Sequence, residues 1–312
     1  MCERTESSVE ITTIIPVYNG ERYLRECLDS AIAQRHVRQE ILVVDDGSND
    51  ATGTILEEYE SRFDADFFRV LRQANAGHIA ARNRAARKAR GAWLAFLDAD
   101  DCWEPEKLLA QKHRIAADVG LIYTERLNFG DIGTLPPRQS ESQTLYEGDL
   151  FHPLLETNFI TVSSVLIRKD LFEQLGGFDP EPTGCEDWDL WLRFSESCSP
   201  PWLAGCVREP LTRYRWRADA MTRRLEIMHR GREIALEKAL KTPRALREVS
   251  RKQRRRARAS IDQISAWVAM ESGQNAAAWY YTLQALRKYP TFYLLRQLGK
   301  IVWKTCRKNK MP

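Results

Sequence analysis

The sequence predicts an α/β protein with a mostly parallel sheet, followed by a helical extension at the C-terminal end. Apolar, β-branched runs alternate with segments of helical periodicity through the first half of the chain, the pattern of strand–helix–strand units. Several runs end in polar side chains, as strands do at the ligand-binding edge of such sheets. Near Thr222 the composition shifts to Lys- and Arg-rich helical segments. We therefore expect an α/β domain over residues 9–222 and a basic, aromatic-rich helical region over residues 223–312.

The strands of the α/β domain are predicted from short apolar runs bounded by turn residues. These runs lie at residues 11–17, 40–46, 67–72, 92–98 and 119–123. Helices are expected between them, over residues 24–32, 51–62 and 76–89 and from Pro105 onward. The first is the clearest, because its apolar residues recur at the spacing of one helix face: Leu24, Cys27, Leu28, Ala31 and Ile32.

The alternation is expected to lapse in the middle of the chain. Residues 128–146 are rich in Gly, Pro, Ser and Gln, which predicts a loop. A strand over residues 161–168 and helices over residues 169–176 and 186–196 are expected to follow.

Composition favours a reduced, cytoplasmic protein. The net charge of +4 argues neither for nor against an anionic partner. Seven cysteines include no C-x-x-C pair, so neither a disulfide framework nor a zinc site is expected. The opening "MCERTESSVE" lacks the layout of a signal peptide, and no apolar run approaches the roughly 18 residues of a membrane-spanning helix.

Three acids follow the predicted strand "AWLAFLD": Asp98, Asp100 and Asp101. On an extended backbone Asp98 and Asp100 would lean to the same side, where two carboxylates repel unless a proton or a cation intervenes. Mg²⁺ and Mn²⁺ commonly take one or two carboxylates and complete their shell with substrate phosphates. The alternative is that these acids are solvated loop residues or cap the helix at Pro105, a role that suits Asp101.

Asp45 and Asp46 follow another predicted strand in the same way. An acid at this position can accept a hydrogen bond from a ribose hydroxyl or a base N–H. The turn "PVYNGERYL" has one glycine, so the G-x-G-x-x-G turn of a dinucleotide dehydrogenase is missing, and the phosphate-binding P-loop motif is absent as well.

These motifs, in this order, resemble the family 2 glycosyltransferases, inverting enzymes with the GT-A fold, a Rossmann-like fold of nucleotide-diphospho-sugar transferases. The resemblance covers roughly residues 11–222 and rests on "IIPVYNG", "ILVVDDGSND", "NAGHIAARN", "FLDADD", "GGFD" and "EDWDLWLR".

The resemblance implies a nucleotide-sugar donor, with UDP the default on family prevalence, and a divalent ion, Mn²⁺ or Mg²⁺, held by Asp98 and Asp100. The nucleotide-binding positions that it implies are Pro16, Val17, Tyr18, Asp46, Gly77, Arg82 and Asp98. Asp187 is implied as the general base, and Glu186 would orient the site or the acceptor.

The chemistry of transfer agrees with these assignments. A nucleoside diphosphate leaves when its developing charge is neutralised, which a metal ion does as a Lewis acid. The acceptor hydroxyl must lose a proton to an ionised carboxylate within hydrogen-bond reach. The positive N-terminus of the "EDW" helix favours that ionised form. Ordinary helix capping is the alternative for Glu186 and Asp187, and Asp189 is expected to be a salt-bridge or first-turn acid.

Two departures from the family pattern bear on function. Processive members carry Q-x-x-R-W after the base, whereas this chain reads "LWLRFSESCSPPW", so we expect one or a few sugars to be added. Many relatives have a histidine in the segment that here reads "YRWRADAMTR". Arg217 stands in that segment, and we expect it to contact the diphosphate.

The predicted function is therefore non-processive transfer to a glycan or lipid-linked acceptor in the biosynthesis of cell-surface polysaccharide or glycolipid. A catalytically inactive nucleotide-sugar binder is one alternative. A nucleic-acid-binding protein is the other, because of "RKQRRRARAS", but no recognition motif accompanies that run and no nucleic acid is expected. The basic, aromatic C-terminal region either contacts a membrane at its inner face or uses its aromatic residues as core.

Overall fold

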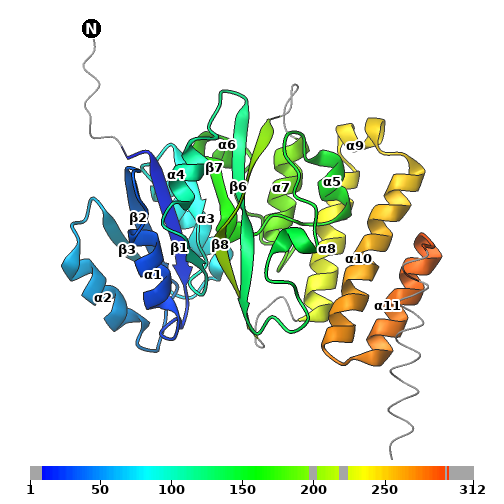
Figure 1. Ribbon diagram of the computed structural model, residues 1–312, viewed down its shortest axis with the longest axis horizontal. Helices are drawn as coiled ribbons and strands as arrows, with labels where there is room; N and C mark the ends of the chain where they lie inside the picture. The colour runs from blue at the N-terminus through cyan, green and yellow to red at the C-terminus, as the bar shows by residue number, and fades with distance from the viewer. Residues whose placement is uncertain (1–8, 197–201, 218–223, 292–293, 295–312) are drawn as a thin grey trace, which may run out of the picture. The chain divides into compact units, whose positions relative to one another are not determined.

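The computed structural model describes residues 9–196, 202–217, 224–291 and 294 (Figure 1). The chain divides into two compact units. The first, here called the sheet unit, comprises Met1–Leu150, Phe159–Pro180 and Ser197–Arg217. The second, called the helical unit, comprises Phe151–Asn158, Glu181–Glu196 and Ala218–Pro312.

Within the described residues, the sheet unit contains one eight-stranded sheet in the order β3-β2-β1-β4-β7-β6-β8-β5. The strands are β1 (Ile11–Val17), β2 (Gln39–Asp45), β3 (Phe68–Arg72), β4 (Trp93–Phe96), β5 (Cys102–Trp103), β6 (Val119–Gly130), β7 (Val165–Arg168) and β8 (Leu203–Trp216). The first four run parallel, β7 is antiparallel to β4 and to β6, and β8 is parallel to β6 and antiparallel to β5.

The register of the parallel strands brings their carboxyl ends together. Val17 at the end of β1 pairs with Asp45 at the end of β2, and Ile14 of β1 pairs with Phe96 at the end of β4. The predicted polar segments that follow these three strands therefore emerge at one edge of the sheet, the edge where open α/β sheets bind ligands.

Helices cover this sheet, each with one face buried. They are α1 (Leu24–Ile32), α2 (Thr52–Arg62), α3 (His78–Lys88), α4 (Lys107–Lys112) and α6 (Lys169–Gln174), with short 3₁₀ turns η1 (Gln139–Glu141) and η2 (Val162–Ser164). The predicted face of α1 is confirmed, since Leu24, Cys27, Leu28 and Ala31 are buried in the core.

The helical unit contains α5 (Phe151–Glu156), α7 (Glu186–Glu196), α8 (Leu225–Leu240), α9 (Pro243–Glu248), α10 (Arg251–Glu271) and α11 (Asn275–Lys288). The apolar stripe of α7 is buried, and the Trp188 indole N–H donates to the Leu154 carbonyl at 2.8 Å. Gly231 allows α8 to pack closely against the segment that precedes α7, because a Cβ at position 231 would lie 2.5 Å from the Thr183 carbonyl oxygen. Among the helices that the structure describes, none is both long and apolar enough to cross a bilayer.

Two predictions about secondary structure need correction, and strand β8 was missed. The predicted loop at residues 128–146 starts inside β6, which continues to Gly130. The predicted strand at residues 161–168 begins only at Val165, after a 3₁₀ turn. Strand β8 was not predicted, because its second half, "REPLTRYRW", is polar and finds its place only by pairing with the distant β6.

Candidate active site

The acids after β4 lie on a tight turn, Asp98–Asp101, called the acid turn below. The Asp101 backbone N–H donates to the Asp98 carbonyl at 2.9 Å, so this segment is not extended. Asp98 and Asp100 are therefore close because the chain turns, and the prediction that an extended backbone aligns them was wrong.

Asp101 is the buried anchor of the acid turn. The residue is only 1% exposed. Its carboxylate accepts hydrogen bonds from the Ser163 hydroxyl at 2.6 Å and from the Arg215 backbone N–H at 2.7 Å. Ser163 in turn accepts from the Asp98 backbone N–H at 3.1 Å. Burial, reinforced by the charges of Asp100 and Asp98, raises the pKa of Asp101 well above its usual range. The alternative that Asp101 caps the following helix does not hold, since α4 starts only at Lys107.

Asp98 and Asp100 each face an arginine. The Asp98 side chain, 27% exposed, forms an ion pair with Arg82. The Asp100 side chain, 25% exposed, lies with its Oδ2 3.0 Å from the Arg217 Nε. Burial and the neighbouring charge of Asp98 raise the pKa of Asp100, while the cation of Arg217 opposes that rise. Negative charge is thus crowded at this turn.

The acid turn fits a divalent cation that is completed by other ligands. Asp98 and Asp100 offer hard carboxylate oxygens from one turn, the donors that Mg²⁺ and Mn²⁺ prefer. No group of three or more His, Cys, Asp or Glu residues that could hold a metal ion occurs among the described residues. A cation here would therefore take the two carboxylates and fill its shell with water or with phosphate oxygens.

Arg215, on β8, fastens the acid turn to its surroundings. Its Nε donates to the Asp100 carbonyl at 2.7 Å, and its guanidinium forms an ion pair with Glu26. The same guanidinium lies 4.5 Å from the Tyr23 ring centre and 4.2 Å from that of Phe129. The sequence marked this segment for its missing histidine but did not reveal that Arg215 braces the turn.

Arg82, on α3, is fixed by the "GGFD" segment. It is 4% exposed, and its guanidinium lies 5.4 Å from the centre of the Phe178 ring. The Asn83 amide donates to the Phe178 carbonyl at 2.8 Å and accepts from its N–H at 2.9 Å. Gly177 has φ +73°, and a Cβ there would lie 2.7 Å from the Asn83 Oδ1. This pair of hydrogen bonds, called the Asn83 clamp below, leaves no room for a side chain at position 177, so the segment needs glycine there.

Asp46 shapes the chain that leads into α3. The residue is only 2% exposed. Its carboxylate accepts hydrogen bonds from the Gln73 amide at 2.7 Å and from the backbone N–H groups of Ala76 and Gly77 at 2.8 and 2.7 Å. Contact between Asp46 and a base stays a prediction, since its oxygens are already engaged by this loop. Gly77, with φ +88°, immediately precedes α3.

The end of β1 exposes one of its three predicted contact residues. Tyr18 is 51% exposed, whereas Pro16 and Val17 are buried in the strand. Tyr18 is therefore the side chain of this segment that a ligand at the sheet edge could stack on.

Glu186 and Asp187 belong to the helical unit, in the first turn of α7. The Asp187 carboxylate accepts from the Asn158 amide at 3.0 Å and from the Trp188 N–H at 2.6 Å. Glu186 is 6% exposed. The salt-bridge role expected of Asp189 is confirmed by its contact with Arg193 at 2.7 Å.

A cation lies near Asp187 within the same unit. Burial lowers the pKa of Arg232, on α8, and the charge of Asp187 acts against that lowering. Arg232 thus places a positive charge near the Asp187 carboxylate.

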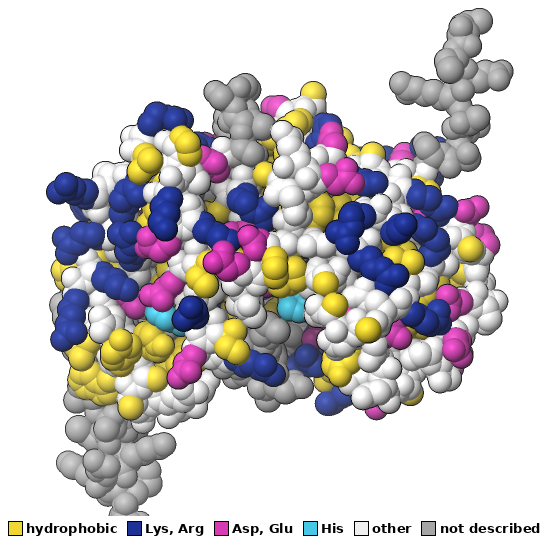
Figure 2. Space-filling model, turned by 180° about the vertical axis from the view of Figure 1, so that it is seen from behind, with side chains coloured by type: hydrophobic (Ala, Val, Ile, Leu, Met, Phe, Trp, Pro, Cys, Tyr) yellow, Lys and Arg dark blue, Asp and Glu magenta, His cyan; other side chains and the backbone are white. Residues whose placement is uncertain are grey.

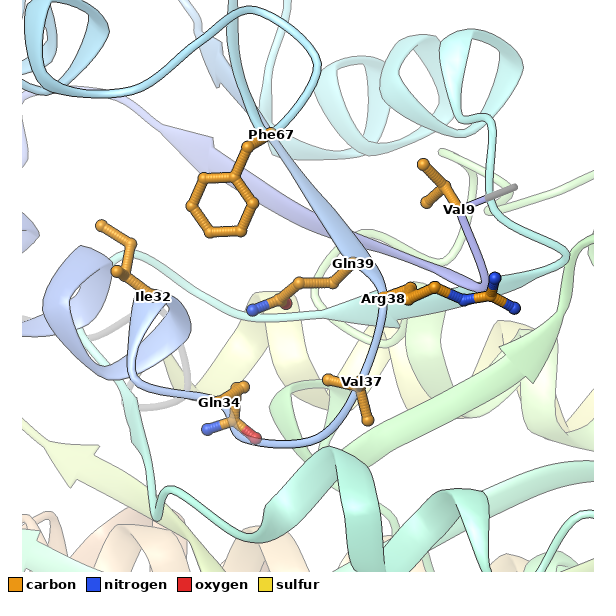
Figure 3. A pocket seen from close by; sticks show the side chains of 7 residues that line it. All are labelled: Val9, Ile32, Gln34, Val37, Arg38, Gln39 and Phe67. Atoms are coloured by element: carbon orange, nitrogen blue, oxygen red, sulfur yellow. The ribbon is translucent and has the colours of Figure 1, made fainter. Parts of the chain in front are cut away.

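A cavity of about 370 Å³ lies elsewhere on the sheet unit (Figure 3). Its lining is Val9, Ile32, Gln34, Val37, Arg38, Gln39 and Phe67. Gln39 is the first residue of β2, so the cavity lies at the strand starts, away from the acid turn. The amides of Gln34 and Gln39 already donate to the Glu104 and Ala31 carbonyls at 2.9 and 2.8 Å. None of the predicted site residues lines this cavity.

Comparison with known families identifies the chain's relatives. Residues 12–176, more than half of the chain, match the family model for glycosyl transferase family 2. The chain belongs to this family. Its members are transferase enzymes, and the predicted family assignment is confirmed.

Among family 2 relatives, glycosyltransferase GlyA of Streptococcus pneumoniae is 46% identical over 180 residues, covering 53% of this chain and 25% of that protein. An uncharacterized glycosyltransferase of Rickettsia prowazekii is 32% identical over 192 residues, covering 59% of this chain and 58% of its own. The chain thus matches less than two thirds of the length of each of these two relatives.

Solved structures confirm the GT-A fold of this family 2 member. Staphylococcus aureus TarS 1–349 in complex with UDP-GlcNAc superposes with a TM-score of 0.57 at 18% identity, covering 90% of each chain. The mannosyltransferase PcManGT of Pyrobaculum calidifontis, in complex with GDP-Man and Mn²⁺, gives 0.58 at 19% identity, covering 95% of this chain and 88% of its own. At this identity the likeness establishes the fold alone.

Proposed function

We propose that this family 2 member is an inverting, non-processive glycosyltransferase that uses a nucleotide-diphosphate sugar, with UDP as the first nucleotide to test. The acceptor would be a hydroxyl of a glycan or lipid-linked precursor of a cell-surface polysaccharide or glycolipid. The observation that carries this proposal is the acid turn, in which the carboxylates of Asp98 and Asp100 each face an arginine at the carboxyl edge of four parallel strands.

The donor side uses charges of both signs. Asp98 and Asp100 would hold the divalent ion, which when bound supplies Lewis-acid stabilisation of the leaving diphosphate. Arg82 and Arg217 add positive charge beside these acids, where a diphosphate would lie. Complexes of structural neighbours with UDP-GlcNAc and with GDP-Man and Mn²⁺ support both the donor class and the metal, and keep GDP as an alternative nucleotide.

On the acceptor side we assign Asp187 as the general base and Glu186 as a residue that orients the acceptor. Three features favour an ionised Asp187: the N-terminal end of α7, the Asn158 amide hydrogen bond and the charge of Arg232. A carboxylate in this state can take the proton of an attacking hydroxyl, and a single displacement at C1 inverts the anomeric centre.

Asp187→Asn tests the proposal. We expect transfer from UDP-sugars to fall by about 10³-fold, because the amide cannot accept the proton, while the affinity for UDP with Mn²⁺ stays at the wild-type level. Glu173→Gln, an exposed acid of α6, is the control and should transfer normally. Unchanged turnover in Asp187→Asn would remove this residue from the mechanism.

A catalytically inactive nucleotide-sugar binder is the second candidate, because Arg217 contacts the predicted metal ligand Asp100. Calorimetry with UDP and Mn²⁺ beside a transfer assay separates the two functions. Binding without turnover, across a panel of nucleotide sugars and acceptors, would favour the binder.

We also propose that the helical unit contacts an anionic membrane surface. Figure 2 shows Lys and Arg side chains spread over one face of the molecule. In the helical unit, Arg251, Lys252 and Arg255 of α10 are exposed. Leu246 on the preceding helix is 68% exposed. Exposed apolar and basic groups on consecutive helices suit contact with anionic lipid. The sequence beyond residue 294, part of the predicted contact region, lies outside the described residues.

Flotation with phosphatidylserine vesicles tests the membrane proposal. The full chain should float with these vesicles but not with neutral ones, and R251Q/K252Q/R255Q should float less. Equal flotation of the triple variant, or binding of the wild-type chain to RNA in preference to vesicles, would refute a membrane role for α10.

A further inference from the structure

The two arginines of the acid turn are held very differently. The Arg82 side chain is 5% exposed and packs over Phe178, which the Asn83 clamp fixes. The Arg217 side chain is 31% exposed and lies 5.6 Å from the Tyr23 ring centre. Packing therefore holds Arg82 in place beside Asp98, whereas the more exposed Arg217 can exchange its contact with Asp100 for solvent or a ligand.

The oxygen of Asp100 that faces Arg217 is one of the two carboxylate oxygens that a divalent cation at the acid turn could bind. Mg²⁺ binds oxygen ligands at about 2.0–2.1 Å. The Arg217 Nε lies 3.0 Å from Oδ2, so its charge would lie next to that of a cation bound to the same oxygen. The two positive charges repel, and the Arg217 side chain, more exposed than that of Arg82, is the one that can move away.

A released Arg217 has an obvious new partner. Guanidinium groups bind phosphate oxygens in bidentate fashion, and a diphosphate that completes the cation's shell would lie beside the acid turn. Arg217 is the last residue of the sheet unit and follows directly on β8, so its backbone stays anchored while its long side chain reorients.

We propose that Arg217 is a built-in counter-cation of the acid turn, which gives up Asp100 when a divalent cation binds and then binds the diphosphate of the donor. This inference rests on the proposed function, because it assumes the same donor and metal site. It predicts that the metal alone binds weakly, against competition from Arg217. It also predicts that metal and nucleotide strengthen each other's binding, because nucleotide gives the displaced guanidinium a partner.

The chain supplies a matched control in Arg213. This residue lies four positions earlier, on β8 itself, with the same charge and a side chain 37% exposed. Its guanidinium lies 3.9 Å from Glu26 and 4.8 Å from the centre of the Phe129 ring. Removing its charge changes the local potential without touching the contact with Asp100.

Calorimetry on the full chain tests the inference with Mn²⁺ alone, UDP alone and UDP in the presence of Mn²⁺, with GDP in place of UDP if UDP does not bind. In Arg217→Gln we expect Mn²⁺ alone to bind about 10-fold tighter than in the wild type, and UDP with Mn²⁺ to bind about 10-fold weaker. In this variant, Mn²⁺ should no longer change the affinity for UDP, and UDP should no longer change the affinity for Mn²⁺. Arg213→Gln should behave like the wild type, and Arg217→Lys should keep the weak binding of Mn²⁺ alone.

The outcomes separate the two proposals. If Mn²⁺ and nucleotide bind to the wild type but Arg217→Gln binds Mn²⁺ alone no tighter, the counter-cation role is wrong and the proposed donor site stands. If neither UDP nor GDP binds to any folded variant with Mn²⁺, as checked by circular dichroism, both proposals fail.

Discussion

The two edges of the parallel sheet use the same residue types to opposite effect. At the strand starts, the fully buried Glu40 of β2 accepts from the Thr12 hydroxyl at 2.7 Å and from Arg69 and Arg90, both at 2.8 Å. At the strand ends, the acid turn crowds three carboxylates, and the pKa of Asp100 is raised through burial and the charge of Asp98.

The difference lies in how completely each charge is satisfied. Burial alone would raise the pKa of Glu40, but the Arg90 backbone N–H, the Thr12 hydroxyl and the two guanidinium groups together lower it. The acid turn keeps its negative charge only partly compensated. A buried charge with all its hydrogen bonds and counter-charges stabilises the fold, whereas a charge with too few partners can bind a ligand. Function is therefore expected at the strand-end edge.

The largest expected effect is on activity, in Asp100→Asn. Loss of this carboxylate removes one of the two proposed cation ligands, so transfer should fall by about 10³-fold. Urea unfolding should change by less than about 1 kcal/mol, since the side chain is partly exposed and the substitution relieves repulsion from Asp98. Normal transfer by this variant would contradict the functional assignment of the acid turn.

Glu40→Gln should show the reverse pattern. Two guanidinium groups lose the buried anion between them, and we expect the free energy of unfolding to fall by about 3 kcal/mol. Transfer measured well below the unfolding temperature should stay close to wild type. Urea denaturation gives the stability change, and a loss of activity without one would break the comparison between the two edges.

Glycine substitutions at the "GGFD" segment sharpen the comparison further. Gly177→Ala should cost about 2 kcal/mol, because its φ is +73° and the new Cβ would collide with the Asn83 clamp beneath Arg82. Gly176→Ala is the matched control. That residue has φ +81° but open space around its Cβ position, so about 1 kcal/mol is expected. Equal losses in thermal unfolding would show that the clamp is not rigid.

The smallest expected effect is on the pH dependence of stability. The lowered pKa of Glu40 means that its contribution is present above the unfolded value of about 4.3 and is lost as pH falls through the folded value. The stability difference between wild type and Glu40→Gln should therefore shrink on acidification. Urea titrations between neutral and acidic pH measure it, and a constant difference would contradict the assigned role of this carboxylate.

Local pattern was sufficient for most elements of the sheet unit. The apolar runs at β1 and β2 and the apolar face of α1 were recognisable because burial on one side leaves a periodic signature in the sequence. Strands β5 and β8 left no such signature. Strand β5 has only two residues. Strand β8 contains several arginines and is held in place by its pairing with β6.

The sequence by itself determined the family, the α/β alternation and the position of Asp98 and Asp100 after a buried strand, since these follow from order and local periodicity. Only the tertiary structure decided which charges meet. Ser163 and Arg215 reach Asp101 from 62 and 114 residues away, and Arg217 meets Asp100 because β8 runs beside β6 and β5. Contacts across such separations depend on how strands pair and helices pack, and no local pattern encodes them.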